Sequence, residues 1–251
     1  MTKPRPPSPV PISPDHRCGT QWPLRSFGAS CLLGGALLLT LLLSSCQRPS
    51  SAGAMEEQNV ADDQQQSGPW IELFDDEHIE SWQRINFGGS ESHSVQTGQI
   101  EVEMGRPVTG IRFDTEDFPT KDYVLELDAK KIQGTDFFCC LTFPVNDTHC
   151  SLVVGGWGGT VTGISCINRM DASDNATTSV KKYHVGQWYK IRVQVQEKQI
   201  SCWIDDQQIV DLSLEDIELG LRIEVEPCKP LGLSSFETAA AWKNLRYKRL
   251  K

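Results

Sequence analysis

Residues 189–196 read YKIRVQVQ, and apolar side chains alternate strictly with polar ones along this stretch. Successive side chains of a β-strand point to opposite faces, so the alternation predicts a strand with one face in a core and the other in water. The same pattern recurs in 100–104 (IEVEM), 123–130 (YVLELDAK) and 221–226 (LRIEVE). Helical periodicity is nearly absent, apart from one short turn expected at 213–219 with Ser213 as its N-cap. The sequence therefore predicts an all-β sandwich or barrel.

The net charge of the chain argues against one class of partner, nucleic acids. The chain has 251 residues, of which 39% are apolar, and a formal charge of −9. Residues 1–45 carry four basic side chains and one acidic, a charge of +3, which leaves −12 for the rest of the chain. A surface that binds nucleic acid needs clustered lysines and arginines, so we expect no nucleic-acid partner.

The N-terminal region has the pattern of an export signal. An apolar run of 17 residues, 27–43, follows Arg25 and ends in small residues. Residues 43–46 (LSSC) resemble a bacterial lipobox, in which the cysteine, here Cys46, carries lipid and the chain is cut just before it. We expect residues 1–45 to be a lipoprotein signal peptide; an ordinary signal or a membrane anchor is the alternative, since 17 residues is the lower limit for spanning a bilayer.

Residues 46–69 contain no aromatic residue and are rich in Gln, Ser, Asp and Glu. Such a segment cannot bury enough apolar surface to offset its ordering entropy, so it is expected to be a flexible tether. The folded domain is then 70–251, or 182 residues. Gln47, directly after the lipidated position, indicates the outer membrane as the site of attachment.

Six stretches of this domain carry a family resemblance. They are 70–82 (WIELFDDEHIESW), 95–100 (VQTGQI), 122–127 (DYVLEL), 186–191 (GQWYKI), 204–210 (IDDQQIV) and 242–246 (WKNLR). In this order they resemble the motifs of the 3-keto-disaccharide hydrolase domain family. The resemblance implies a concanavalin-like jelly-roll sandwich of two antiparallel sheets. It also implies an action on glycosides, such as hydrolysis of 3-keto-glycosides.

The chain departs from that family where its polar strands cross the concave face. Typical members have an N-S-G strand that ends in arginine, then a strand with a Glu-x-Gln pattern. Here the two regions read GTDFFCCLTFP (134–144) and HCSLVVGGW (149–157), without the arginine or the glutamate. The family's hydrolase residues therefore cannot be carried over, and whether the domain is an enzyme stays open.

A sugar site needs an aromatic ring to stack on and polar groups that bind hydroxyls. The region after residue 135 offers Asp136 and His149 as catalytic candidates, and Trp157, Asn168 and Arg169 as substrate-binding candidates. Glycines flank Trp157, so its ring lacks bulky neighbours and backbone can approach a ligand closely. The alternative is a flexible hairpin tip with an exposed tryptophan, and a histidine that merely lies at the surface.

The stretch 221–226 adds two candidates. Arg222 and Glu224 point away from the apolar residues of the predicted strand, so they would line the groove if that strand lies in the concave sheet. A glutamate beside an arginine stays ionised, which suits Glu224 to a catalytic base and Arg222 to substrate binding. The alternative is a solvated outer face. The oxygen-rich loop 170–175 matches no EF-hand spacing, so we expect no metal and no cofactor.

The nine cysteines separate into groups. Cys18 and Cys31 lie in the expected signal, and Cys46 would carry lipid, which leaves six in an exported domain where disulfides are permitted. A hairpin centred on Gly158 would place Cys150 opposite Cys166, and we predict a disulfide between them. The alternative is that they are small buried residues of the core.

Three functions remain open for the predicted domain. It is an envelope-attached enzyme acting on glycosides, a carbohydrate-binding module without turnover, or a structural envelope lipoprotein. The expected partners are a carbohydrate or glycoside, and the membrane through the lipid anchor. Converging carboxylates beside an open groove would favour the enzyme, and a groove filled by apolar side chains would count against both sugar functions.

Overall fold

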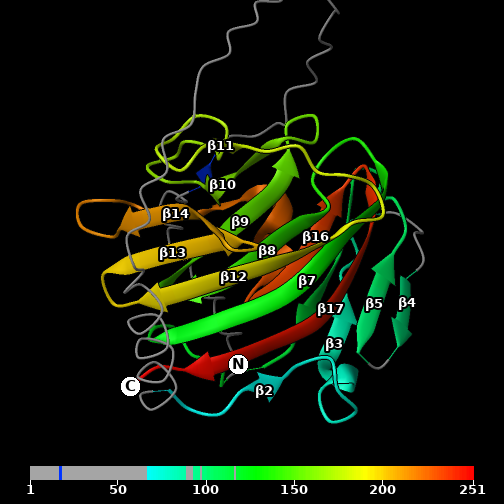
Figure 1. The fold of residues 1–251 in the computed structure, drawn as a ribbon, viewed down its shortest axis with the longest axis horizontal. Helices are drawn as coiled ribbons and strands as arrows, with labels where there is room; N and C mark the ends of the chain where they lie inside the picture. Colours follow the sequence, from blue (N-terminus) through cyan, green and yellow to red (C-terminus); the bar gives the residue numbers. More distant parts are fainter. Residues whose placement is uncertain (1–16, 19–66, 89–92, 97, 116) are drawn as a thin grey trace, which may run out of the picture.

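The alternating stretches form strands of two facing sheets in the computed structural model, which describes residues 17–18, 67–88, 93–96, 98–115 and 117–251 (Figure 1). Every strand pair inside these two sheets is antiparallel, and the fold is the predicted jelly-roll sandwich. The seven-stranded sheet has the order β11 (Ser179–Val180), β10 (Val161–Ser165), β9 (Thr148–Gly156), β8 (Cys139–Val145), β16 (Leu231–Phe236), β6 (Val108–Phe113) and β3 (Trp82–Arg84).

The eight-stranded sheet lies in front of it in Figure 1. Its order is β14 (Gln207–Ser213), β13 (Gln199–Ile204), β12 (Trp188–Gln196), β7 (Tyr123–Gly134), β17 (Thr238–Arg249), β5 (Gln99–Val102) and β4 (His93–Gln96), with β2 (Ile71–Glu72) paired to β17. The short remaining elements are β1 (Arg17–Cys18), which pairs in parallel with β15 (Leu221–Arg222), and the 3-10 helices η1 (Ile79–Ser81) and η2 (Ile223–Cys228).

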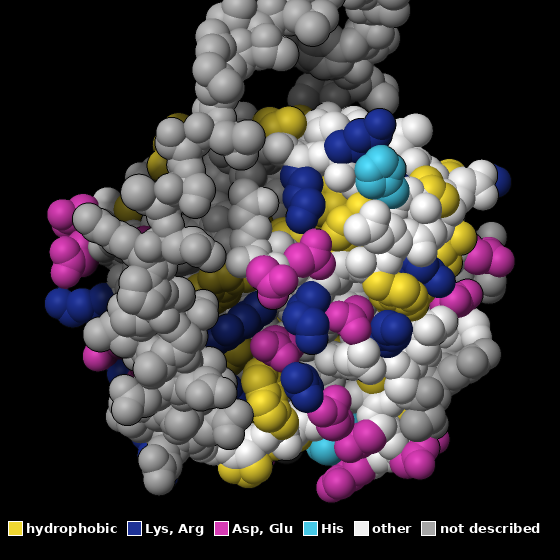
Figure 2. Space-filling view, in the orientation of Figure 1, with side chains coloured by type: hydrophobic (Ala, Val, Ile, Leu, Met, Phe, Trp, Pro, Cys, Tyr) yellow, Lys and Arg dark blue, Asp and Glu magenta, His cyan; other side chains and the backbone are white. Residues whose placement is uncertain are grey.

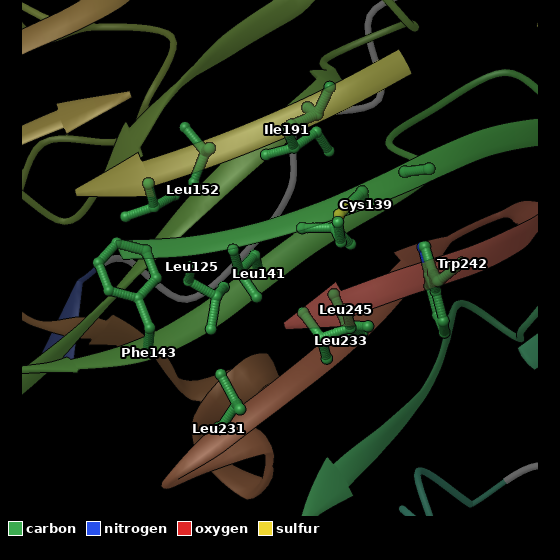
Figure 3. Packing of buried hydrophobic residues seen from close by; sticks show 14 of the residues in the cluster. Leu125, Cys139, Leu141, Phe143, Leu152, Ile191, Leu231, Leu233, Trp242 and Leu245 are labelled. Carbon is green, nitrogen blue, oxygen red and sulfur yellow. The ribbon is translucent and has the colours of Figure 1, made fainter. Parts of the chain in front are cut away.

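The core lies between the sheets and consists of the side chains that the period of two predicted (Figure 3). Leu125 and Leu127 of β7 face Leu141 and Phe143 of β8, and all four are fully buried. Trp242 of β17 is also fully buried, and its indole Nε1 donates a hydrogen bond to the carbonyl of Phe138 at 3.0 Å. Burial of each such side chain stabilises the fold by roughly 1.5–3 kcal/mol.

Two local predictions were wrong. The alternation in 221–226 continues as a strand only through Arg222, and η2 follows. Val225 and Cys228 of this 3-10 helix pack with Leu221 in one apolar cluster on a sheet face, which a continued strand ladder would not allow. The expected helical turn at 213–219 is not helical. Ser213 instead ends β14, and its hydroxyl accepts a hydrogen bond from the Glu215 amide at 3.3 Å.

Most of the predicted signal peptide and tether, including Cys46, lies outside the described residues. The described body begins at Ser67, which forms a β-bridge with Leu250, so the last residues of the predicted tether lie against the sandwich. Within the described ranges, none of the helices has the length and apolar character needed to cross a bilayer.

Candidate functional site

The outer face of the seven-stranded sheet, where the family resemblance places the polar strands, is lined here by small side chains. Cys140 and Thr142 of β8, Ser151 of β9 and Ser234 of β16 point away from the core and are nevertheless buried. They are buried because β15 and η2 lie over this face.

The contact between η2 and the sheet is close. Val225 and Cys228 of η2 join one apolar cluster with Cys140 of the sheet. Gly232 makes this possible, since a Cβ there would lie 2.5 Å from the Cys228 carbonyl oxygen. A residue with a side chain at 232 would push η2 off the face. The covering segment therefore occupies space that an open groove would need.

Arg222 is the polar centre of the covering segment. Its side chain is 1% exposed, and its Nη1 lies 2.5 Å from Asp171 Oδ2 while its Nη2 lies 3.4 Å from Glu224 Oε1. Burial disfavours the charged guanidinium, but the two carboxylates outweigh that effect and raise the pKa of Arg222. We call Asp171, Arg222 and Glu224 the Arg222 cluster. The Asp171 and Glu224 side chains are 23% and 20% exposed, but Glu224 Oε2 itself is buried with no hydrogen-bond partner among the described residues.

His149 lies at the other end of η2. It is on β9, opposite Pro144 of β8, and its Nε2 is buried with no hydrogen-bond partner among the described residues. Burial lowers the pKa of His149, and the charge of Lys229 lowers it further, against the opposing effect of Glu226. The imidazole is therefore neutral at pH 7, with a proton on one ring nitrogen and a lone pair on the other.

Asp136 belongs to a different place. It lies between β7 and β8, and its carboxylate accepts hydrogen bonds from the amides of Phe137 at 2.8 Å and Gly158 at 3.1 Å. Burial raises the pKa of Asp136, while these amides and the charge of Lys131 act in the opposite direction. The carboxylate thus holds the tip of the β9–β10 hairpin.

Trp157 sits at this tip and is less open than its glycine neighbours suggested. Its backbone has φ +49°, and its side chain is half-buried against the apolar cluster under η2. The ring therefore does not stand free as a stacking platform.

Asn168 and Arg169 bind the chain at Glu218. The amide N–H of Asn168 donates to the Glu218 carbonyl and its Oδ1 accepts from the Glu218 amide, both at 2.8 Å. The Nε of Arg169 lies 3.9 Å from a Glu218 carboxylate oxygen, and this arginine is 69% exposed. These contacts fix the loop that carries Asp171 to the Arg222 cluster.

Oxygen atoms of loop 170–175 accept hydrogen bonds from groups of the protein itself, including the Asp171 carbonyl and the Asp171 carboxylate. Asn175 Nδ2 donates to the carbonyls of Ile164 and Asp171, each at 2.8 Å. The group with metal-like spacing in the described ranges lies elsewhere, at Asp75, Glu77 and His78, where Asp75 Oδ1 is hydrogen-bonded to His78 Nδ1 at 2.7 Å.

The predicted disulfide between Cys150 and Cys166 is absent, because both thiols are free and buried. The hairpin register pairs Ser165 with Ser151, so the next pair outward would be these two cysteines. However, β10 ends at Ser165, and Cys166 takes φ +62°, which leaves the ladder. Cys150 packs in the core between the sheets.

The structure thus brings Arg222 and Glu224 together and places His149 on the same sheet face. The residue that sequence reasoning missed is Asp171, which was considered only as part of a metal loop. The signal was present, because Arg222 stands between Leu221 and Ile223, and a buried arginine requires a carboxylate partner.

Comparison with known proteins gives one family. A family model described as "3-keto-alpha-glucoside-1,2-lyase-like domain" matches residues 69–248. No curated protein matches the chain.

Several solved structures are similar at low identity. The carbohydrate binding module CBM66 from Bacillus subtilis is 13% identical, with a TM-score of 0.42 over 67% of this chain and 95% of that one. Domain 4 of AbnA, a GH43 extracellular arabinanase from Geobacillus stearothermophilus in complex with arabinotriose, is 14% identical, with a TM-score of 0.46 over 74% and 93%. The apo Crh5 transglycosylase is 13% identical, with a TM-score of 0.48 over 72% and 83%.

Proposed function

Because this chain belongs to the family of 3-keto-alpha-glucoside-1,2-lyase-like domains, we propose that it binds a glycoside at the Arg222 cluster and does not hydrolyse it. The ligand would lie against the partly exposed side chains of Asp171 and Glu224, at the side of η2. The small side chains beneath η2 are covered and take no part.

The observation that carries this proposal is the shared guanidinium. Asp171 and Glu224 both contact Arg222, which holds two carboxylate side chains next to each other. Carboxylate oxygens accept hydrogen bonds from sugar hydroxyls. Hydrolysis of a glycoside instead needs one carboxyl group that stays protonated as a general acid. The pKa of Asp136 is raised, but backbone amides occupy its carboxylate.

One observation favours turnover as a second candidate. His149 is neutral, and its buried Nε2 has no hydrogen-bond partner among the described residues, so this nitrogen is not occupied within the described part of the protein. In a 3-keto-glycoside the ketone acidifies the C2 proton. A base that takes this proton allows a C1–C2 double bond to form as the C1–O bond breaks, and the leaving oxygen then takes a proton from water. That elimination needs no protonated carboxyl group.

A glycan array with the full chain in detergent tests binding, followed by assays on 3-keto-glucosides and polysaccharide fragments. Replacement of Glu224 by Gln removes one charged acceptor and is expected to weaken glycan binding about ten-fold. The matched control is Glu215→Gln, on an exposed turn. Binding without turnover supports the proposal. Turnover that is lost in His149→Asn supports the second candidate, and no binding to any glycan contradicts both.

We also propose that the domain is exported and held on the outer membrane by lipid on Cys46. The lipobox-like residues 43–46 and the basic flank support this. Metabolic labelling with palmitate should mark the wild type and Cys31→Ser but not Cys46→Ser. Equal labelling of all three would contradict it. β1 lies in the segment that this cleavage would release. The mature protein would therefore lack the strand that pairs with β15 at Arg222.

A further inference from the structure

A second polar site lies on the opposite side of the sandwich, on the outer face of the eight-stranded sheet. A hollow of about 150 Å³ opens there between β2, β7, β12 and β17. Figure 2 shows basic and acidic side chains side by side over the middle of this face. The polar residues that line the hollow are Glu72, Glu126, Asp128, Lys190, Asn244 and Arg246. We call this the β17 hollow.

An irregularity in β17 coincides with the hollow. The register between β17 and β7 shifts between Lys243 and Arg246, so two residues of β17, Asn244 and Leu245, lie opposite one of β7. Asn244 has φ +53°, a left-handed backbone that asparagine adopts more readily than most residues. Such bulges re-aim side chains and are frequent next to functional sites. Here Asn244 Nδ2 donates to Asp128 Oδ2 at 2.6 Å.

Arg246 is held in a fixed position at the hollow. Its Nη2 lies 3.0 Å from Glu126 Oε2 and its Nη1 lies 3.7 Å from Glu72 Oε1. The ring of Trp70 packs on the guanidinium, with the ring centre 4.4 Å from its carbon. Groups that are already fixed lose little conformational entropy when a ligand binds.

The charges select the class of ligand. Three carboxylates would repel an anion, and Lys190 and Arg246 would repel a cation. A neutral molecule with several hydroxyl groups satisfies both, because each hydroxyl can donate to a carboxylate and accept from a cation or an amide. The hydroxyl groups of one sugar ring match this alternation of acceptors and donors.

Size and the neighbouring rings restrict the ligand further. The volume of about 150 Å³ is small, which suits one ring and not a chain. The tryptophan rings near the hollow already make cation–π contacts. The Nζ atoms of Lys130 and Lys243 lie 4.6 and 4.2 Å from the ring centre of Trp188. Recognition would therefore use hydrogen bonds rather than stacking.

We propose that the β17 hollow binds a single neutral polyhydroxylated ring, such as one pyranose unit of a glycan. The site is separate from the Arg222 cluster, which lies on the other sheet, and does not depend on it. A chain with both sites would contact a glycan on two opposite faces.

Saturation-transfer NMR on the full chain in detergent tests the proposal with three probes: methyl α-D-glucopyranoside, methyl β-D-galactopyranoside and myo-inositol. At least one probe should bind the wild type. Asp128→Asn and Glu126→Gln each remove a charged acceptor and should raise its Kd about ten-fold. Lys190→Gln replaces an exposed side chain, carries little risk to folding and should also weaken binding. The matched control Asp211→Asn, exposed on β14 of the same sheet, should leave the Kd unchanged.

The proposal is overturned if no probe binds, or if the three hollow variants bind with the wild-type Kd. Glu224→Gln separates the two sites. If that variant loses probe binding while Asp128→Asn keeps it, the hollow is excluded and the Arg222 cluster is the binding site. The reverse result supports the hollow and shows that the probe does not bind at the Arg222 cluster.

Discussion

Arg222 Nη1 lies 2.5 Å from Asp171 Oδ2, and this pair ties the segment that covers the seven-stranded sheet to the loop after β10. The two residues are 51 positions apart in the chain. The pair therefore holds η2 over the outer face of the seven-stranded sheet, and it supplies two of the charged groups of the candidate binding site.

The first prediction concerns stability. Replacement of Arg222 by Met leaves Asp171 and Glu224 without their shared cation, and we expect the free energy of unfolding to fall by about 3 kcal/mol. Urea unfolding at pH 7 measures this. Arg169→Met is the control, since that side chain is exposed and should change stability little. Equal unfolding midpoints for both variants would contradict a structural role for Arg222.

The second prediction concerns pH. Burial, with Lys229, lowers the folded-state pKa of His149 below its ordinary 6.5, so the neutral imidazole stabilises the fold. This contribution is fully present above pH 6.5 and is lost as the pH falls through the lowered folded-state pKa. Acidification should therefore lower the free energy of unfolding of the wild type more than that of His149→Asn.

NMR titration of the His149 ring protons should give a midpoint below 6.5. Glu226→Gln should lower that midpoint further and Lys229→Gln should raise it, because the two side chains act in opposite directions. A wild-type midpoint at or above 6.5 would show that the imidazole is not buried as described.

The third prediction compares two adjacent glycines at the hairpin tip. Gly158 and Gly159 have φ +86° and +95°, so alanine at either is strained by roughly 1–2 kcal/mol. A Cβ at Gly159 would also lie 3.0 Å from the Thr135 carbonyl oxygen and 3.1 Å from Lys131 Nζ, whereas one at Gly158 meets nothing within 4 Å. We expect Gly159→Ala to be the less stable variant by about 1 kcal/mol. Equal thermal stability would argue against this contact.

The fourth prediction concerns the thiols of the sandwich. Burial raises the pKa of the Cys140 thiol to about 12, and burial also raises the pKa of Cys202. Since the thiolate is the reactive form, these cysteines should react slowly with iodoacetamide in the native protein. After unfolding without reductant, peptide mapping should find Cys150 and Cys166 both alkylated. A peptide that links the two would contradict the structure.

Some elements were predictable because their information is local. The alternation in 123–130 and 189–196 became β7 and β12, with the apolar side chains turned to the core as the period requires. The six motifs predicted the family, and the family resemblance in turn predicted the jelly-roll fold. Each strand needs only its own residues to show which face will be buried.

Other elements depended on neighbours that the pattern does not encode. The stretch LRIEVE fits an alternating strand, yet it leaves the ladder after Arg222 because Val225 and Cys228 find an apolar surface on the sheet below. Cys166 would oppose Cys150 by register, and its left-handed backbone removes it from that position.

The sequence by itself determined the all-β class, strands such as β7 and β12 with their buried faces, and the family, because period and motif are properties of short segments. Only the tertiary structure decided which sheet face η2 covers, which carboxylate pairs with Arg222 and where β17 opens a hollow. Those features arise from contacts between residues that are distant in the chain, such as Asp171 with Arg222 and Asp128 with Asn244, and a local pattern carries no information about such partners.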